Sequence, residues 1–112
     1  MKTYKSLIVN DLSFRQMEPR LRGLIEKVID EELTPEGLRL LRRIAEGFEP
    51  LIQSKRDMMF GHFIGQVSAA LVFLAQQLYD RHPTAEEKEE MGRILQSRAR
   101  EIIDAIERGL HR

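Results

Sequence analysis

One stretch constrains the fold more than any other: the run from Met58 to Tyr79, MMFGHFIGQVSAALVFLAQQLY, contains no Lys, Arg, Asp or Glu. Nothing between Pro50 and Arg81 is typical of a loop, because the glycines there lie among large apolar residues. We therefore expect one long helix from about residue 50 to residue 81, roughly 45–50 Å in length at about 1.5 Å per residue.

The same run is long enough to cross a bilayer, and its first two glycines form a GxxxG pattern. Against a membrane span, the run contains polar side chains that hydrocarbon disfavours, and its strictly apolar part is short. These polar residues are His62, Gln66, Ser68, Gln76 and Gln77. We therefore expect no membrane. We expect instead a central helix that its neighbours bury on most sides. Like a membrane span, such a helix has apolar residues around its whole circumference.

Helical periodicity and capping signals predict the other elements. Ser13 and Gln16 form a capping-box pattern ahead of a first helix that ends near residue 33, and Pro19 predicts a kink or a restart inside it. The sequence TPEG predicts the start of a second helix over residues 34–48, because Thr caps free amides and Pro fits the first helical position. A second capping box opens a last helix over residues 84–110.

The length of 112 residues fits a single domain, with residues 1–12 as an N-terminal arm of uncertain structure. Short connections favour antiparallel neighbours. The predicted fold is an all-α, three- to four-helix antiparallel bundle with one long central apolar helix. Such a helix in a small chain favours a twofold homodimer in which the long helices pair and complete the bundle.

Composition excludes several kinds of chemistry. The chain has no cysteine, which removes disulfides, thiolate zinc sites, iron–sulfur clusters and cysteine nucleophiles. No phosphate-binding loop, nucleophile elbow or zincin motif occurs, so we expect no catalysis and no cofactor. The N-terminus lacks the apolar region and cleavage site of a signal peptide, and we expect a cytoplasmic protein.

A strip of small residues marks one side of the long helix. Gly61, Gly65 and Ala69 follow one another at i,i+4 spacing, and each glycine costs about 1 kcal/mol of helix propensity relative to alanine. Close helix packing would offset that cost. We expect a tight seam at these residues together with Met58 and Phe73, against either another helix of the same chain or a second copy.

His62 and Gln66 lie four residues apart and can hydrogen-bond to each other. A metal site at His62 would need carboxylates from other helices, such as Glu26, Asp30 or Glu46, because no E-x-x-H or H-x-x-x-H pattern is present. A partly buried histidine with its hydrogen bonds satisfied is the favoured interpretation. The metal site is kept as a lesser alternative.

Arg39, Arg42 and Arg43 lie on one side of the second helix and could contact phosphates. However, 18 basic residues balance 18 acidic ones, and no helix-turn-helix turn or aromatic platform accompanies the arginines. The sequence thus favours a non-catalytic interaction or regulatory module that binds itself and an unidentified protein. A nucleic-acid-associated protein comes second, and a metal- or ligand-binding bundle at His62 third.

Overall fold

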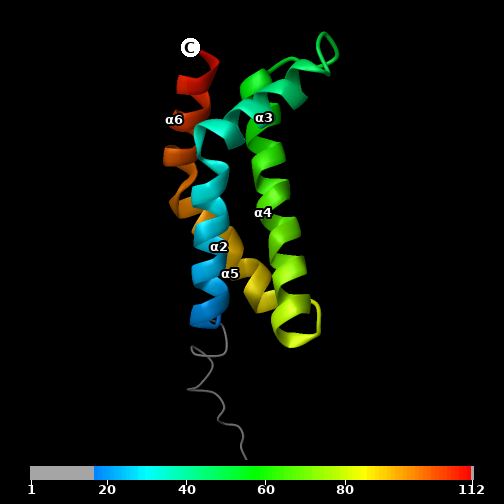
Figure 1. Cartoon of the computed structure of the whole chain (residues 1–112), viewed down its shortest axis with the longest axis vertical. Coiled ribbons are helices and arrows are strands. Elements are labelled where there is room, and N and C mark those ends of the chain that lie inside the picture. Colours follow the sequence, from blue (N-terminus) through cyan, green and yellow to red (C-terminus); the bar gives the residue numbers. More distant parts are fainter. Residues whose placement is uncertain (1–16, 112) are drawn as a thin grey trace, which may run out of the picture.

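In a computed structural model, the described part of the chain, residues 17–111, consists of helices without any strand, which confirms the all-α prediction. The helices are α2 (Pro19–Glu32), α3 (Pro35–Glu46), α4 (Lys55–Tyr79), α5 (Ala85–Ser97) and α6 (Ala99–Leu110) (Figure 1). The predicted Ser13 cap and the arm over residues 1–12 lie outside this part.

The start of α3 follows its predicted local signal, and α2 begins at Pro19, where a kink or a restart was predicted. The described helix α2 begins at Pro19, and the carboxylate of Glu18 accepts a hydrogen bond from the Arg20 amide at 2.7 Å. Proline suits a first helical position because the amide hydrogen it lacks would have no helical partner there. At α3, Thr34 Oγ1 accepts from the Gly37 amide at 3.2 Å. Both helices therefore begin where capping chemistry directs them.

The long helix α4 is shorter at its N-terminus than predicted. It begins after Ser54, whose hydroxyl accepts a hydrogen bond from the Asp57 amide at 3.0 Å, and the residues before it form turns and bends. It ends at Asp80, which adopts a left-handed conformation with φ of 56°. Its 25 residues span roughly 37 Å at about 1.5 Å per residue.

The last predicted helix, over residues 84–110, consists of two helices in the structure, α5 and α6. α5 ends at Ser97, whose hydroxyl donates to the Ile94 carbonyl oxygen at 2.8 Å, and α6 begins after Arg98. A serine hydroxyl that bonds back to the preceding turn competes with the helical ladder and favours a bend. The Arg98 side chain reaches α2 at this break, so the bend also has a tertiary cause.

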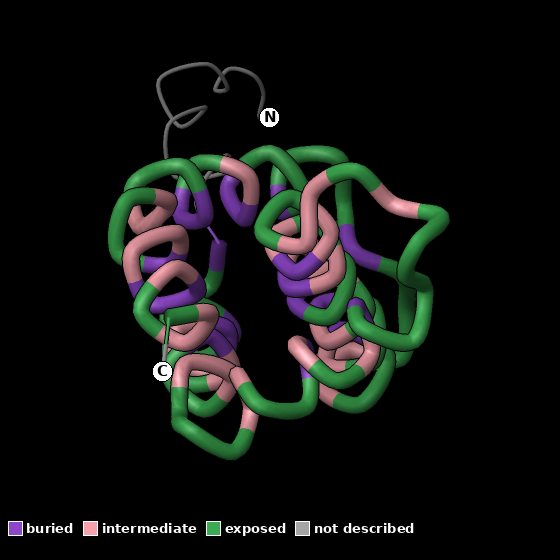
Figure 2. The backbone as a smooth tube through the Cα atoms, turned by 90° about the horizontal axis from the view of Figure 1, so that it is seen from above, coloured by how far each residue is buried: buried purple, intermediate pink, exposed green. Residues whose placement is uncertain are grey.

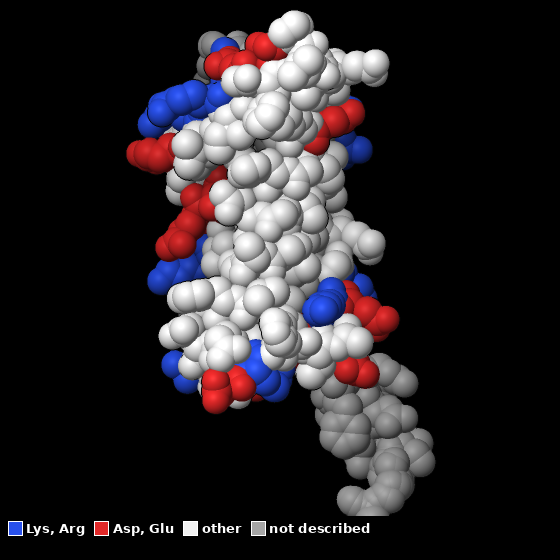
Figure 3. Space-filling model, turned by 90° about the vertical axis from the view of Figure 1, so that its right-hand side faces the viewer, with Lys and Arg blue, Asp and Glu red and all other residues white. Residues whose placement is uncertain are grey.

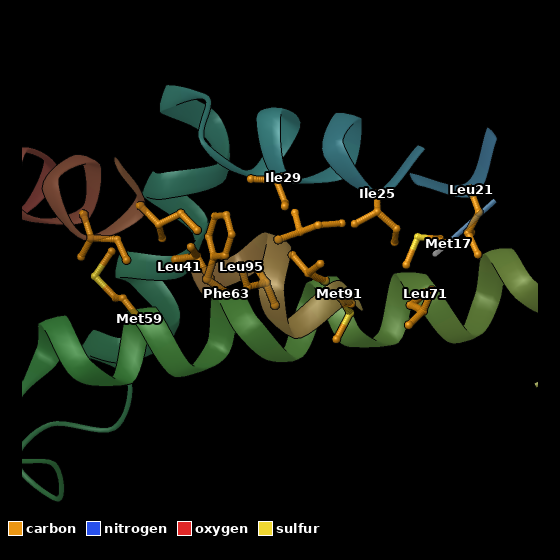
Figure 4. Close-up of a cluster of buried hydrophobic side chains, with 14 of the residues drawn as sticks. Met17, Leu21, Ile25, Ile29, Leu41, Met59, Phe63, Leu71, Met91 and Leu95 are labelled. Atoms are coloured by element: carbon orange, nitrogen blue, oxygen red, sulfur yellow. The ribbon is translucent and has the colours of Figure 1, made fainter. Parts of the chain in front are cut away.

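α4 packs against each of the other four described helices and runs opposite to α2 and α6, while α3 crosses one end (Figure 1). Buried residues line the inward sides of the helices (Figure 2). In the core, Phe63 of α4 lies close to Ile29 of α2 and Leu41 of α3, and Ile25 of α2 lies farther along α4, toward Leu71 (Figure 4). Met91 and Leu95 of α5 complete this part of the core.

The prediction that neighbours bury α4 on most sides is wrong. A single stripe at i,i+4 spacing is buried, consisting of Met59, Phe63, Val67, Leu71 and Ala75. The opposite side of α4 has no helix of the described chain over it. Apolar residues therefore occur around the whole circumference of α4, although only one face of this helix lies in the core of the chain.

Candidate protein–protein interface on α4

The outward side of α4 is a continuous surface without charge. Gly61, Gly65 and Ala69 are exposed, and two large apolar side chains follow them, Val72 at 41% and Phe73 at 62% exposure. The space-filling view toward α4 shows uncharged atoms over the middle of the molecule, with Lys, Arg, Asp and Glu at its margins (Figure 3). We call this surface the α4 face, defined by Met58, Gly61, Gly65, Ala69, Val72 and Phe73.

The glycines of the α4 face have open space in front of them. A Cβ atom added at Gly61 or Gly65 would find no atom within 4 Å, apart from the backbone of α4 itself. No other helix of residues 17–111 approaches them, so of the two alternatives the seam with a helix of the same chain is not formed there. Contact with a second copy remains a prediction.

The two larger predicted seam residues lie at opposite ends of the α4 face. Met58 is half-buried and touches the core cluster with part of its side chain. Phe73 is among the most exposed large apolar residues of the described chain. Scattered exposed apolar residues are ordinary, whereas a contiguous apolar surface marks an interaction site in soluble proteins.

The predicted polar pair is formed at the edge of the α4 face. Gln66 Nε2 lies 3.3 Å from His62 Nε2, and His62 is half-buried. Glu32 of α2 is the nearby acid: burial raises the pKa of its carboxyl group, and the charge of His62 opposes that rise. His62 is thus placed between the core and the open side of α4.

The carboxylates that might have joined His62 in a metal site are engaged elsewhere. Glu26 and Asp30 pair with Arg98 at 2.9 and 2.7 Å, and Glu46 pairs with Arg42 at 2.9 Å. Within residues 17–111, no group of three or more His, Asp or Glu side chains could hold a metal ion.

The arginines of α3 do not act as one set. Arg42 donates to Glu46 and, through Nη1, to the Gly109 carbonyl oxygen of α6 at 3.1 Å, so its charge fixes α3 to the end of α6. Arg39 lies 4.0 Å from Glu36, and Arg43 is exposed. A pocket of about 190 Å³ beside them is lined by Pro35, Leu38, Arg39, Arg42 and Gly109.

Sequence reasoning missed two features. Arg98, at the break between α5 and α6, pairs with Glu26 and Asp30 of α2, which lie 72 and 68 residues away, and no local pattern signals such a pairing. An apolar groove of about 250 Å³ runs between Phe60 and Ile64 of α4 and Leu95 of α5. Gly92, Gln96 and Ala99 also line it, and the small size of Gly92 and Ala99 leaves this flank of α4 open.

Comparison of the chain with protein-family models, with curated proteins and with solved structures finds no match. By length and composition alone, α4 is the single helix within residues 17–111 that could cross a membrane, a test that core helices of soluble proteins also pass. The local chemistry of the α4 face therefore carries the functional argument.

Proposed function

We propose that this chain is a non-catalytic protein–protein interaction module of the cytoplasm that self-associates through the α4 face. The observation that carries the proposal is the charge-free, exposed side of the longest helix, with Val72 and Phe73 open to solvent. Burying apolar surface is the main favourable term in protein association, and the centres of interfaces are depleted in charge. The self-associated protein would present its remaining surface to a second, unidentified protein partner.

The length of the α4 face along the helix is a second argument for such a role. A stable interface buries about 800 Å² on each partner, which needs more than an isolated apolar residue. The α4 face follows the helix over most of its length, and the groove beside Phe60 and Ile64 widens the apolar area next to it. Phosphate binding by the arginines has less support, because Arg42 already neutralises Glu46 and holds the end of α6.

Sedimentation of the full chain over a range of concentrations tests the proposal. We expect dimers to form in the micromolar range, and Gly65→Leu to weaken self-association at least tenfold, about 1.4 kcal/mol. The leucine has space in the monomer, so the fold should persist. The matched control is Gly23→Leu on the exposed side of α2, where an added Cβ also meets nothing within 4 Å. A wild-type monomer at high micromolar concentration would contradict the proposal.

A further inference from the structure

We propose that the occupant of the α4 face is the α4 face of a second copy, running antiparallel and crossing at Gly65. This inference rests on the proposed function and specifies the orientation and register of the contact. It follows from the order of side-chain sizes along α4 and from the charges at its two ends.

The sizes along the face are self-complementary about Gly65. In a twofold antiparallel contact, residue i of one copy faces residue j of the other and j faces i, so the sum of the two numbers is constant. With Gly65 facing Gly65, Gly61 faces Ala69 and Met58 faces Val72. The smallest residues then meet where the axes are closest, and the larger side chains meet where two crossing helices diverge. No charged residue lies between Met58 and Tyr79, so the contact buries no charge along that length.

The ends of α4 favour the antiparallel direction over the parallel one. Its N-terminal end carries the positive end of the helix dipole together with Lys55, Arg56 and Asp57. The two basic side chains there also pair with acids of the same chain, Lys55 with Glu46 and Arg56 with Glu107. Its C-terminal end carries the negative end of the dipole and Asp80, whose described side-chain partner is the uncharged Gln76 at 2.8 Å, while the adjacent Arg81 pairs with Glu87. An antiparallel copy brings Asp80 toward the positive end of its partner's helix. A parallel copy would place Asp80 beside Asp80 and Lys55 beside Lys55.

The same arrangement sets Phe73 on the flank that carries the polar pair at the edge of the face. Phe73 follows His62 by 11 residues, close to three helical turns of about 3.6 residues each, so both lie on one flank of α4. A twofold axis between antiparallel helices sets this flank of one copy beside the same flank of the other. In this register Phe73 is level with residue 57 of the second copy, five residues or roughly 7.5 Å along the axis from His62 at about 1.5 Å per residue. Phe73 therefore lies on the flank that carries the half-buried His62 and the exposed Gln66 of the second copy.

Disulfide trapping tests the orientation, because the natural chain has no cysteine. A disulfide requires Cα atoms within about 7 Å, so it reports close helix approach. Gly61→Cys and Ala69→Cys are prepared as separate proteins, one with a larger tag, and are oxidised alone and as a mixture. We expect the mixture to yield at least fivefold more cross-linked product, joining the two different variants, than either protein oxidised alone. Gly65→Cys should cross-link to itself, and Arg100→Cys, with a side chain 83% exposed on α6, should not.

The outcomes separate this inference from the proposed function. Efficient self-linking of Gly61→Cys and of Ala69→Cys, without the mixed product, would overturn the antiparallel orientation and indicate a parallel pair. A dimer that Gly65→Leu dissociates, but in which the mixed product does not form, would overturn the register and leave the α4 face as the interface. A monomer in sedimentation would overturn both.

Discussion

At the scale of the residue, two helical glycines have opposite surroundings. A Cβ added at Gly37, near the start of α3, would clash with the backbone carbonyl group of Glu32 and lie 2.9 Å from its carbonyl carbon. A Cβ added at Gly23 on α2 would meet nothing within 4 Å. The first glycine permits a close approach of two backbones, and the second only weakens its helix.

Alanine substitutions should therefore change stability in opposite directions. We expect Gly37→Ala to lower the free energy of unfolding by about 1–3 kcal/mol, because backbone must move to admit the methyl group. Gly23→Ala should raise it by up to about 1 kcal/mol, the difference in helix propensity. Urea unfolding followed by circular dichroism measures both. Equal effects at the two sites would show that the contact of Gly37 with the end of α2 is not tight.

Arg98 is the residue that joins the most charged groups. Its side chain is 18% exposed and pairs with Glu26, Asp30 and Glu101 at 2.7–2.9 Å. These hydrogen bonds raise the pKa of the Arg98 guanidinium above its ordinary value, with Glu101 the largest contributor. Arg98 thus fixes the break between α5 and α6 against α2.

Replacing this guanidinium should cost stability at neutral pH. We expect Arg98→Met to lower the free energy of unfolding by about 1–2 kcal/mol, since the three carboxylates lose a common partner but keep contact with water. The matched control is Arg100→Met, whose side chain is 83% exposed and lies 3.9 Å from Asp104. That control should change stability by less than about 0.5 kcal/mol. Similar losses for the two variants in urea unfolding would argue against a structural role for the cluster.

At the scale of the element, the start of α5 combines a capping box with an ion pair. Thr84 and Glu87 exchange hydrogen bonds at 2.9 and 3.0 Å, and Arg81 donates to both carboxylate oxygens of Glu87 at 2.9 and 3.1 Å. The hydrogen bond from Arg81 is the main reason that the pKa of Glu87 is lowered from its ordinary 4.5. Burial of Glu87 acts in the opposite direction.

This lowered pKa makes the stability of the protein depend on pH. A carboxyl group whose pKa is lower in the folded state stabilises the fold above its unfolded pKa, and loses that contribution as pH falls through the folded pKa. Glu87→Gln keeps the capping geometry but removes the charge, so we expect it to be less stable than wild type at pH 7 by about 1 kcal/mol. The difference should shrink as pH falls below the ordinary 4.5 and vanish once Glu87 is protonated in both the folded and the unfolded state. Exposed Glu89→Gln on α5 serves as the control, and a difference independent of pH would contradict the role of the ion pair.

Which elements the sequence could predict depends on the range of the interactions that fix them. The caps at Thr34 and Thr84 lie within four residues of the groups they bond, so their patterns were readable. The Ser54 cap is equally local, but the apolar run beyond it suggested a longer helix. The bend at Arg98 also depends on α2, which is far away in the sequence. The spacing of apolar residues along a helix does not reveal such a distant partner.

At the scale of the whole molecule, the small-residue strip was predictable as a feature but not as a surface. Spacing places Gly61, Gly65 and Ala69 on one side of α4, yet it does not say which side of the helix the chain covers. The position of α2, α3 and α6 decides that, and they pack on the stripe through Phe63 and Val67. The strip faces outward because the larger residues on the other side bury more apolar area.

If two copies pair through this outward face, the folding of each chain is linked to association. The dissociated, unfolded chains gain in population on dilution, so the thermal midpoint of a dimer rises with protein concentration. A tenfold increase in concentration is worth about 1.4 kcal/mol per dimer, which we expect to raise Tm by a few degrees in a chain of this size. Gly65→Leu should shift the dependence to concentrations at least tenfold higher, whereas Gly23→Leu should leave it unchanged. Calorimetry from about 5 to 500 µM measures the dependence, and a midpoint that is constant for the wild type across that range would exclude a dimer coupled to folding.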